Sequence, residues 1–210
     1  MLRRTFVQGA ALVAASAIPC AVPCAFAFKA GDDYVELESP IQGAEGLLIK
    51  LFSYDCPFCY KYDVAVDPEL RERIRETGLR FAPWHIEARG KYGRAASEFL
   101  AWCELLDGAS DRSVTDADSL YKKAKDAWYK AYNRQARHWF AGEESFLKTG
   151  EDATGLSHAD FETARKTPEV AALADLWRTG YDTARTRVCH LAWIFNKAAP
   201  LNGGSRFFHT

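Results

Sequence analysis

The sequence predicts an α/β fold in which an early strand–helix–strand unit is separated from a late strand by a long helical block. Leu47–Phe52 is a largely apolar run of strand length, and His190–Asn196 is another. Between residues 90 and 185, apolar side chains recur instead at the three- and four-residue spacings of helices. With 210 residues, of which 48% are hydrophobic, the chain can bury the core of one compact domain that carries an insertion.

The early unit consists of short strands around one helical segment. Asp33–Glu38 alternates as a strand does, and Leu79–Ile86 is predicted to be the strand that follows the helix. Pro57 suits the first turn of that helix, and Pro68 predicts a kink within it. The unit therefore places residues 56–59 where the first long strand meets the helix.

The helical block contains several recognisable segments. Four side chains share one helical face, namely Phe99, Trp102, Cys103 and Leu106. Ala124–Phe140 is predicted as a second helical stretch, and Ser157 as the cap of a short helix. Thr167 is predicted to cap the last helix, with Pro168 at its first position.

An aromatic set and a basic set of side chains lie in and just before the second helical stretch. The aromatic set is predicted to be helical core and consists of Trp128, Tyr129, Tyr132, Trp139 and Phe140. The basic set is predicted to be a solvated face and consists of Lys122, Lys123, Lys125 and Lys130.

The first 27 residues have the features of a cleavable export signal. Two arginines begin the segment, Gly9–Ala27 carries no charge, and Ala25-Phe26-Ala27 offers an A-x-A cleavage site. The prolines at positions 19 and 23 argue against a retained membrane-spanning helix. The paired arginines also resemble a twin-arginine signal, so both export routes stay open. The formal net charge of −1, with interspersed signs, gives no electrostatic basis for binding nucleic acid or an anionic membrane.

Cys56-Pro57-Phe58-Cys59 is the motif that carries chemistry. Two cysteines separated by two residues can close a disulfide within one helical turn. The first sulfur would lie near the unpaired N–H groups of a helix start, which lower its pKa and make the disulfide more oxidising. Metal ligation and a purely structural disulfide are the alternatives, and the exported, proline-containing context favours redox use.

Around this motif the sequence resembles the DsbA family of thiol:disulfide interchange proteins. The resemblance rests on Gly31–Leu37, on Pro40 and most sharply on Leu51–Tyr60, and its pattern extends to residue 196. It implies a thioredoxin-like fold with an inserted helical domain. It also implies that Cys56 is the exposed nucleophile and Cys59 the resolving thiol.

The resemblance implies an organisation and a set of partners as well. Residues 1–27 would be the signal, 28–89 the first thioredoxin part, 90–185 the helical insertion with its last helix packed on the core, and 186–210 a shortened final part. The protein would be a periplasmic oxidase that needs no cofactor and acts on unfolded or reduced exported proteins. A DsbB-like membrane quinone reductase would reoxidise it and would be its sole link to the membrane.

Two departures from the family pattern lie close to the cysteines. Phe58 stands where DsbA proteins usually have histidine, so it cannot donate to the Cys56 thiolate; Pro-Phe is compatible with the DsbL branch. Lys50 stands where the family has a buried acid. It is either a buried ammonium that favours thiolates and moves a proton, or a side chain that snorkels from a strand end. Asp63, by contrast, matches a helix acid common in the family.

Two further departures lie late in the chain. Ala192–Asn196 matches the segment after the family's cis-proline, which puts Leu191 at the proline position, with His190 and Cys189 before it. A non-proline cis bond costs about 2.5–4 kcal/mol, so we predict a trans bond and a different loop facing Cys56. The 14 residues after Asn196 provide for a strand but not for the family's C-terminal helix.

The remaining cysteines leave alternatives open. Cys103 is predicted to be core, with a disulfide to Cys189 as the alternative. Cys189 and His190 would lie near Cys56 and Cys59 and could complete a metal site there, although no metal is assigned. The competing functions are therefore a periplasmic copper- or zinc-binding protein and a client-binding homologue without turnover. An isomerase or reductase is the alternative within the enzyme class.

Overall fold

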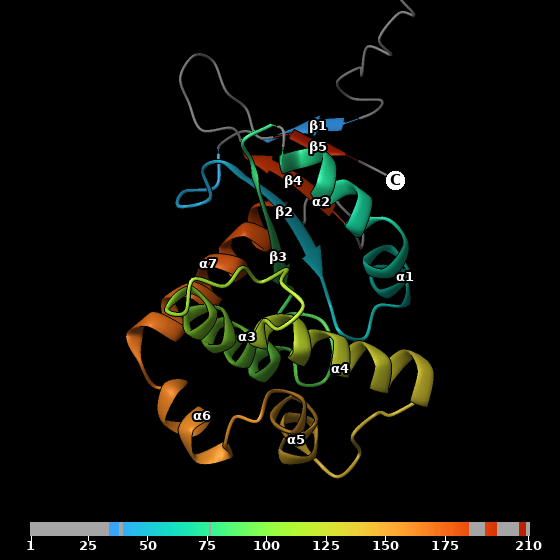
Figure 1. The fold of residues 1–210 in the computed structure, drawn as a ribbon, viewed down its shortest axis with the longest axis vertical. Coiled ribbons are helices and arrows are strands. Elements are labelled where there is room, and N and C mark those ends of the chain that lie inside the picture. The colour runs from blue at the N-terminus through green and yellow to red at the C-terminus, as the bar shows by residue number, and fades with distance from the viewer. Residues whose placement is uncertain (1–33, 38–39, 76, 185–191, 197–205, 209–210) are drawn as a thin grey trace, which may run out of the picture.

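The computed structural model describes residues 34–37, 40–75, 77–184, 192–196 and 206–208. The predicted signal, and the segment that carries Cys189, His190 and Leu191, lie outside the described residues. Figure 1 shows a sheet flanked by helices in one half of the molecule and a helical layer in the other. Within the described residues, no helix is both long and apolar enough to cross a membrane.

The described residues form a sheet of five strands in the order β1-β5-β4-β2-β3. Their bounds are Tyr34–Glu36 for β1, Leu47–Phe52 for β2, Arg80–His85 for β3, Ala192–Asn196 for β4 and Arg206–Phe208 for β5. Strands β2 and β3 are parallel, with Leu47 opposite Arg80 and Phe52 opposite His85, while the other pairs are antiparallel. All six residues of β2 are buried, as an apolar central strand requires.

Seven helices are described. They are α1 Pro57–Ala65, α2 Asp67–Arg75, α3 Gly93–Gly108, α4 Leu120–Gln135, α5 Glu143–Thr154, α6 His158–Ala164 and α7 Pro168–Ala184. The first two connect β2 to β3, which confirms the predicted strand–helix–strand unit. The expected kink at Pro68 is a full break, because one helix ends at Ala65 and the next begins at Asp67.

The helix ends follow their local signals. The Ser157 side chain accepts from the Asp160 N–H at the start of α6, and α7 begins at Pro168, as predicted. The predicted helix Ala124–Phe140 is wrong at both ends. Ser119 caps the helix one turn earlier, and Ala136 ends it by adopting a left-handed φ of 50°.

One hydrophobic core joins the sheet to the helical layer. It extends from Ile49 on β2 to Phe99 on α3 and Trp177 on α7. Helix α7 approaches β3 so closely that a Cβ on Gly180 would lie 2.4 Å from Trp84, so glycine is required there. The Tyr121 hydroxyl on α4 donates to the Pro83 carbonyl on β3. The helical layer is therefore fixed to the sheet beside which the cysteines lie.

Three of the five aromatic side chains assigned to the core are buried, while Tyr132 is partly buried against it and Phe140 is exposed. Trp128, Tyr129 and Trp139 are at most 4% exposed, whereas Phe140 is 86% exposed. The prediction for Phe140 is wrong because the helix has ended before that residue and the following turn points it to solvent. Cys103 is fully buried on α3, as predicted.

Candidate redox site

The two cysteines occupy the first turn of α1. Cys56 is the N-cap in an extended conformation, and Pro57 is the first helical residue, where its missing N–H is not needed. The Cys59 N–H donates to the Cys56 sulfur over 3.2 Å. The local sequence therefore places one sulfur at the positive end of the helix and the second sulfur one turn inside it.

The two thiols differ in acidity. A hydrogen bond from the Cys59 thiol, with the N–H groups of Cys59 and Phe58, lowers the pKa of Cys56 to about 6, although burial opposes this shift. The same hydrogen bond, together with burial, raises the pKa of Cys59 well above its usual range. At neutral pH the reduced pair therefore holds its negative charge on Cys56.

The surroundings of the pair correct one expectation. Cys56 is 6% exposed and Cys59 is fully buried, so the first sulfur is the more accessible but is not an exposed group. Phe58 is 63% exposed, and the Lys61 ammonium lies 5.6 Å from its ring centre. The motif therefore presents an aromatic side chain to solvent, where the resemblance suggested an open sulfur.

Lys50 is buried, so the interpretation that it snorkels from a strand end is wrong, while its role in the thiol chemistry stays a prediction. Its side chain is 1% exposed, so it does not snorkel to the surface. Its Nζ donates to the Asp67 carboxylate over 2.6 Å and to the Cys59 carbonyl over 3.3 Å. Strand β2 thereby places a positive charge directly behind the second cysteine.

Asp63, which is partly buried, and Lys125 complete a group of four charges with Lys50 and Asp67, which we call the charge quartet. Lys125 on α4 donates to Asp63 on α1, and Asp63 also lies 3.8 Å from Lys50. Lys125 is 4% exposed, so its assignment to a solvated helix face is wrong. The group of four lysines suggested a solvated face, but α4 packs against α1 at this position and encloses the Lys125 side chain.

The two acids of the quartet differ in acidity. Burial raises the pKa of Asp63, but Lys125 and Lys50 outweigh it and bring the pKa below its ordinary value. Burial raises the pKa of Asp67 above its ordinary value despite the contact with Lys50. One oxygen of Asp67, Oδ1, has no hydrogen-bond partner among the described residues. Sequence reasoning missed Asp67, and its spacing of four residues from Asp63 on neighbouring helices was the available signal.

His85, at the end of β3, is fully buried and neutral. Its Nδ1 lies 2.9 Å from the Ser97 hydroxyl, and burial lowers its pKa to about 3. Its ring stacks on Tyr54, two residues before Cys56, with a centroid distance of 5.7 Å. The histidine therefore supports the turn before the cysteines and does not bring a charge to it.

Metal ligation receives no support in the described part of the chain. No three His, Cys, Asp or Glu side chains gather there in a way that could hold a metal ion. The alternative metal site of Cys56, Cys59, Cys189 and His190 would need two residues that lie outside the described residues.

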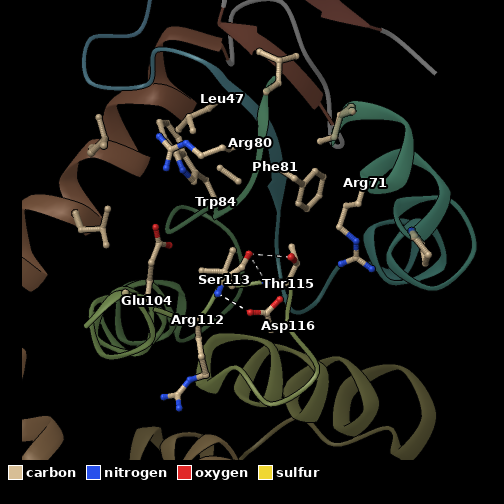
Figure 2. A pocket seen from close by; sticks show the side chains of 18 of the residues that line it. Leu47, Arg71, Arg80, Phe81, Trp84, Glu104, Arg112, Ser113, Thr115 and Asp116 are labelled. Carbon is tan, nitrogen blue, oxygen red and sulfur yellow. Dashed lines mark hydrogen bonds between the residues drawn. The ribbon is translucent and has the colours of Figure 1, made fainter. Parts of the chain in front are cut away.

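Two pockets lie outside the cysteine pair. The larger, of about 740 Å³, lies beside the edge strand β3, where Figure 2 shows Glu104 extending from α3 toward Arg80 and Trp84. Burial raises the pKa of Glu104 to about 7. Neither cysteine lines this pocket, so we do not place the redox site there.

The smaller pocket, of about 440 Å³, borders α1 and has four basic side chains on its wall, namely Arg71, Lys122, Lys130 and Arg134.

Comparisons with known proteins agree with this geometry. The chain is 46% identical over 163 residues to the thiol:disulfide interchange protein DsbL of Escherichia coli O6:H1. The aligned residues cover 77% of this chain and 73% of that protein. It is 44% identical over 176 residues to DsbL of Lelliottia amnigena, covering 83% and 78%. No family model matches the chain.

Solved structures show the same likeness. The DsbL structure from Salmonella enterica serovar Typhimurium superposes with a TM-score of 0.76 at 42% identity, over 88% of this chain and 89% of that one. A DsbA structure from Klebsiella pneumoniae gives a TM-score of 0.63 at 13% identity, over 87% and 85%, and supports the shared fold. The thioredoxin-like fold with a helical insertion is thereby confirmed.

Proposed function

The chain belongs to the DsbL group of DsbA-family thiol:disulfide interchange proteins, and we propose that it is an oxidase that forms disulfides in exported proteins through Cys56 and Cys59. That it is a thiol:disulfide oxidoreductase follows from its relatives, which are 44–46% identical to it. The relatives favour this activity over the metal-binding and non-catalytic alternatives. The direction of the reaction and the roles of the two sulfurs form the proposal.

The first step opens the disulfide of the oxidised protein. A substrate thiolate attacks the Cys56 sulfur, which is the more accessible of the two. A bond forms between the substrate and Cys56, the Cys56–Cys59 bond breaks, and Cys59 leaves with the electron pair and takes up a proton. The Lys50 ammonium, 3.3 Å from the Cys59 carbonyl, stabilises the charge that develops on Cys59.

The second step releases the substrate. A second substrate thiolate attacks the first substrate sulfur, and Cys56 leaves as a thiolate. A thiol of lower pKa leaves faster, and the pKa of Cys56 is lowered to about 6. In sum, two substrate thiols become one disulfide, and the protein gains two electrons and one proton, which lies on Cys59, while the second proton passes to solvent. The place of the Cys56 sulfur at the start of α1, where it accepts from the Cys59 N–H over 3.2 Å, carries the proposed oxidase direction, and the lowered pKa of Cys56 agrees with it.

The location and the redox partner follow from the same proposal. The N-terminal segment supports export to the periplasm, a compartment in which disulfides persist. The reduced pair must pass its electrons on before another cycle. We propose a DsbB-like, quinone-linked membrane protein as the acceptor, because each cycle delivers two electrons and membership of the DsbA family implies such a partner.

The reduction potential of the pair tests the oxidase direction. The mature protein, with Cys103→Ser and Cys189→Ser, is equilibrated with glutathione buffers and the fraction of reduced Cys56–Cys59 is measured. We expect a potential near the DsbA value of about −120 mV. A potential near that of thioredoxin, about −270 mV, would contradict an oxidase and favour a reductase.

A further inference from the structure

Lys125 is a buried lysine that crosses from the helical layer to the redox helix. It lies on α4, and its ammonium pairs with Asp63 on α1, a residue 62 positions earlier in the chain. Its other carboxylate neighbour is Asp126, whose Oδ1 lies 3.3 Å away. The Tyr129 ring centre lies 5.5 Å from the same nitrogen and closes the site from one side. A charge so enclosed is screened little by solvent.

The contacts of the quartet divide it into two ion pairs. Asp63 is nearer to Lys125 than to Lys50, which lies 3.8 Å away. Lys50 instead contacts Asp67 at 2.6 Å and the Cys59 carbonyl. Because Asp63 already has a cation from α4, Lys50 can remain behind Cys59.

The formal charges of the quartet also balance. Two lysines face two aspartates, so the net charge beneath the cysteines is zero while all four are ionised. The neighbouring charged groups are Arg71 on α2, which acts on Asp63, and Asp126 with its partner Lys122 on α4. Loss of one lysine would leave an unbalanced negative charge near the place where reduction creates a thiolate.

We propose that Lys125 is a positioning residue for the redox reaction, which by neutralising Asp63 keeps Lys50 on Asp67 and Cys59 and thereby favours the reduced pair. This inference rests on the proposed function, in which Cys56 and Cys59 cycle between disulfide and dithiol. Through Lys125, the inserted helical layer would influence the equilibrium between the disulfide and the dithiol in the thioredoxin part.

The test is the equilibrium of the pair with glutathione in three variants, all carrying Cys103→Ser and Cys189→Ser. Lys125→Met leaves Asp63 unbalanced, and we expect the equilibrium to shift about tenfold toward the disulfide, equivalent to about one pKa unit. Asp63→Asn leaves an excess positive charge, and we expect a shift of similar size toward the dithiol. The double variant restores the balance and should return to within about threefold of the parent.

Two further variants separate charge from packing. Lys125→Arg keeps the positive charge and should retain the parent equilibrium. Lys123→Met removes an exposed lysine from the same helix and should change nothing. Circular dichroism and thermal unfolding establish that each variant is folded. A defect in folding would move both single variants in one direction, whereas a charge balance predicts opposite directions and cancellation.

The inference is overturned if Lys125→Met changes the equilibrium less than twofold, or if Lys125→Met and Asp63→Asn shift it in the same direction. Its failure can be told apart from failure of the proposed function. Oxidation of a reduced dithiol peptide by the parent protein tests the function alone. If the parent oxidises the peptide while Lys125→Met is unshifted, only the inference fails; if the parent does not oxidise it, the proposed function fails.

Discussion

Two buried acidic sites in this molecule use their carboxylates differently. Asp107, at the end of α3, is fully buried and accepts from the Ser119 hydroxyl, from two N–H groups at the start of α4 and from Arg112. Asp67, below the cysteines, is also fully buried, but it bonds to Lys50 through one oxygen and its other oxygen has no partner among the described residues. A carboxylate with all its acceptor positions used holds a structure together. The Asp67 carboxylate has one oxygen without a hydrogen-bond partner among the described residues and lies among other charges. Its protonation can therefore change when a neighbouring charge changes.

The largest expected effect is on the structural site. Asp107→Ala leaves four donors without their acceptor, two of them backbone N–H groups, and we expect a loss of about 3–5 kcal/mol in the free energy of unfolding. Urea unfolding measures this loss, and Asp118→Ala, at an exposed position of the neighbouring loop, is the control. The glutathione equilibrium should stay at the parent value; a tenfold shift would mean that Asp107 also governs the thiols.

Removal of one charge from the quartet should change the rate of disulfide opening more than it changes the free energy of unfolding. Lys50→Met removes the cation behind Cys59, raises the pKa of that leaving thiol and should slow opening of the disulfide by about tenfold. Buried Asp67 can then take up a proton, so we expect a smaller stability loss than for Asp107→Ala. Stopped-flow reduction by a small dithiol measures the rate. An unchanged rate would remove Lys50 from the mechanism.

The pH dependence of the cysteines sharpens the contrast. Because the pKa of Cys56 is lowered to about 6, its alkylation by iodoacetamide should rise with pH to a midpoint at about pH 6. The lowered pKa of Cys56 also makes the stability of the reduced protein depend on pH. Thiolate formation stabilises the folded reduced protein above the unfolded thiol pKa of about 8.5, and this contribution is lost as pH falls through about 6. The melting temperature of the reduced form, relative to the oxidised form, should therefore fall between pH 8 and pH 5. An alkylation midpoint above pH 8 would contradict the lowered pKa.

The smallest effect concerns the basic wall of the pocket beside α1. Lys130 is exposed on this wall, and Lys130→Ala should weaken the reaction with an acidic substrate peptide by about two- to threefold, as exposed ion pairs contribute little. The ratio of kcat/KM for the acidic peptide and its amide counterpart measures this. If both peptides lose equally, charge on this wall does not select substrates.

Local chemistry explains how much of the fold was predictable. Ser157 and Pro168 specify helix starts through contacts within one turn, so α6 and α7 begin where the sequence indicates. The apolar run of β2 and the Cys-x-x-Cys spacing likewise depend on neighbours in the chain. These signals fix the strand, the helix that follows it and the position of both sulfurs between them.

Tertiary packing decided what the quartet contains. The sequence grouped Lys125 with the lysines of a solvated helix face, yet contact between α4 and α1 buries it against a residue 62 positions away. The sequence allowed two interpretations of Lys50 on β2, and its burial depended on Asp67, a partner on helix α2. The sequence alone thus determined the redox motif and its place at a helix start, because those depend on contacts within a turn. Only the folded chain decided which charges surround the motif, since burial of a lysine depends on segments that meet through folding.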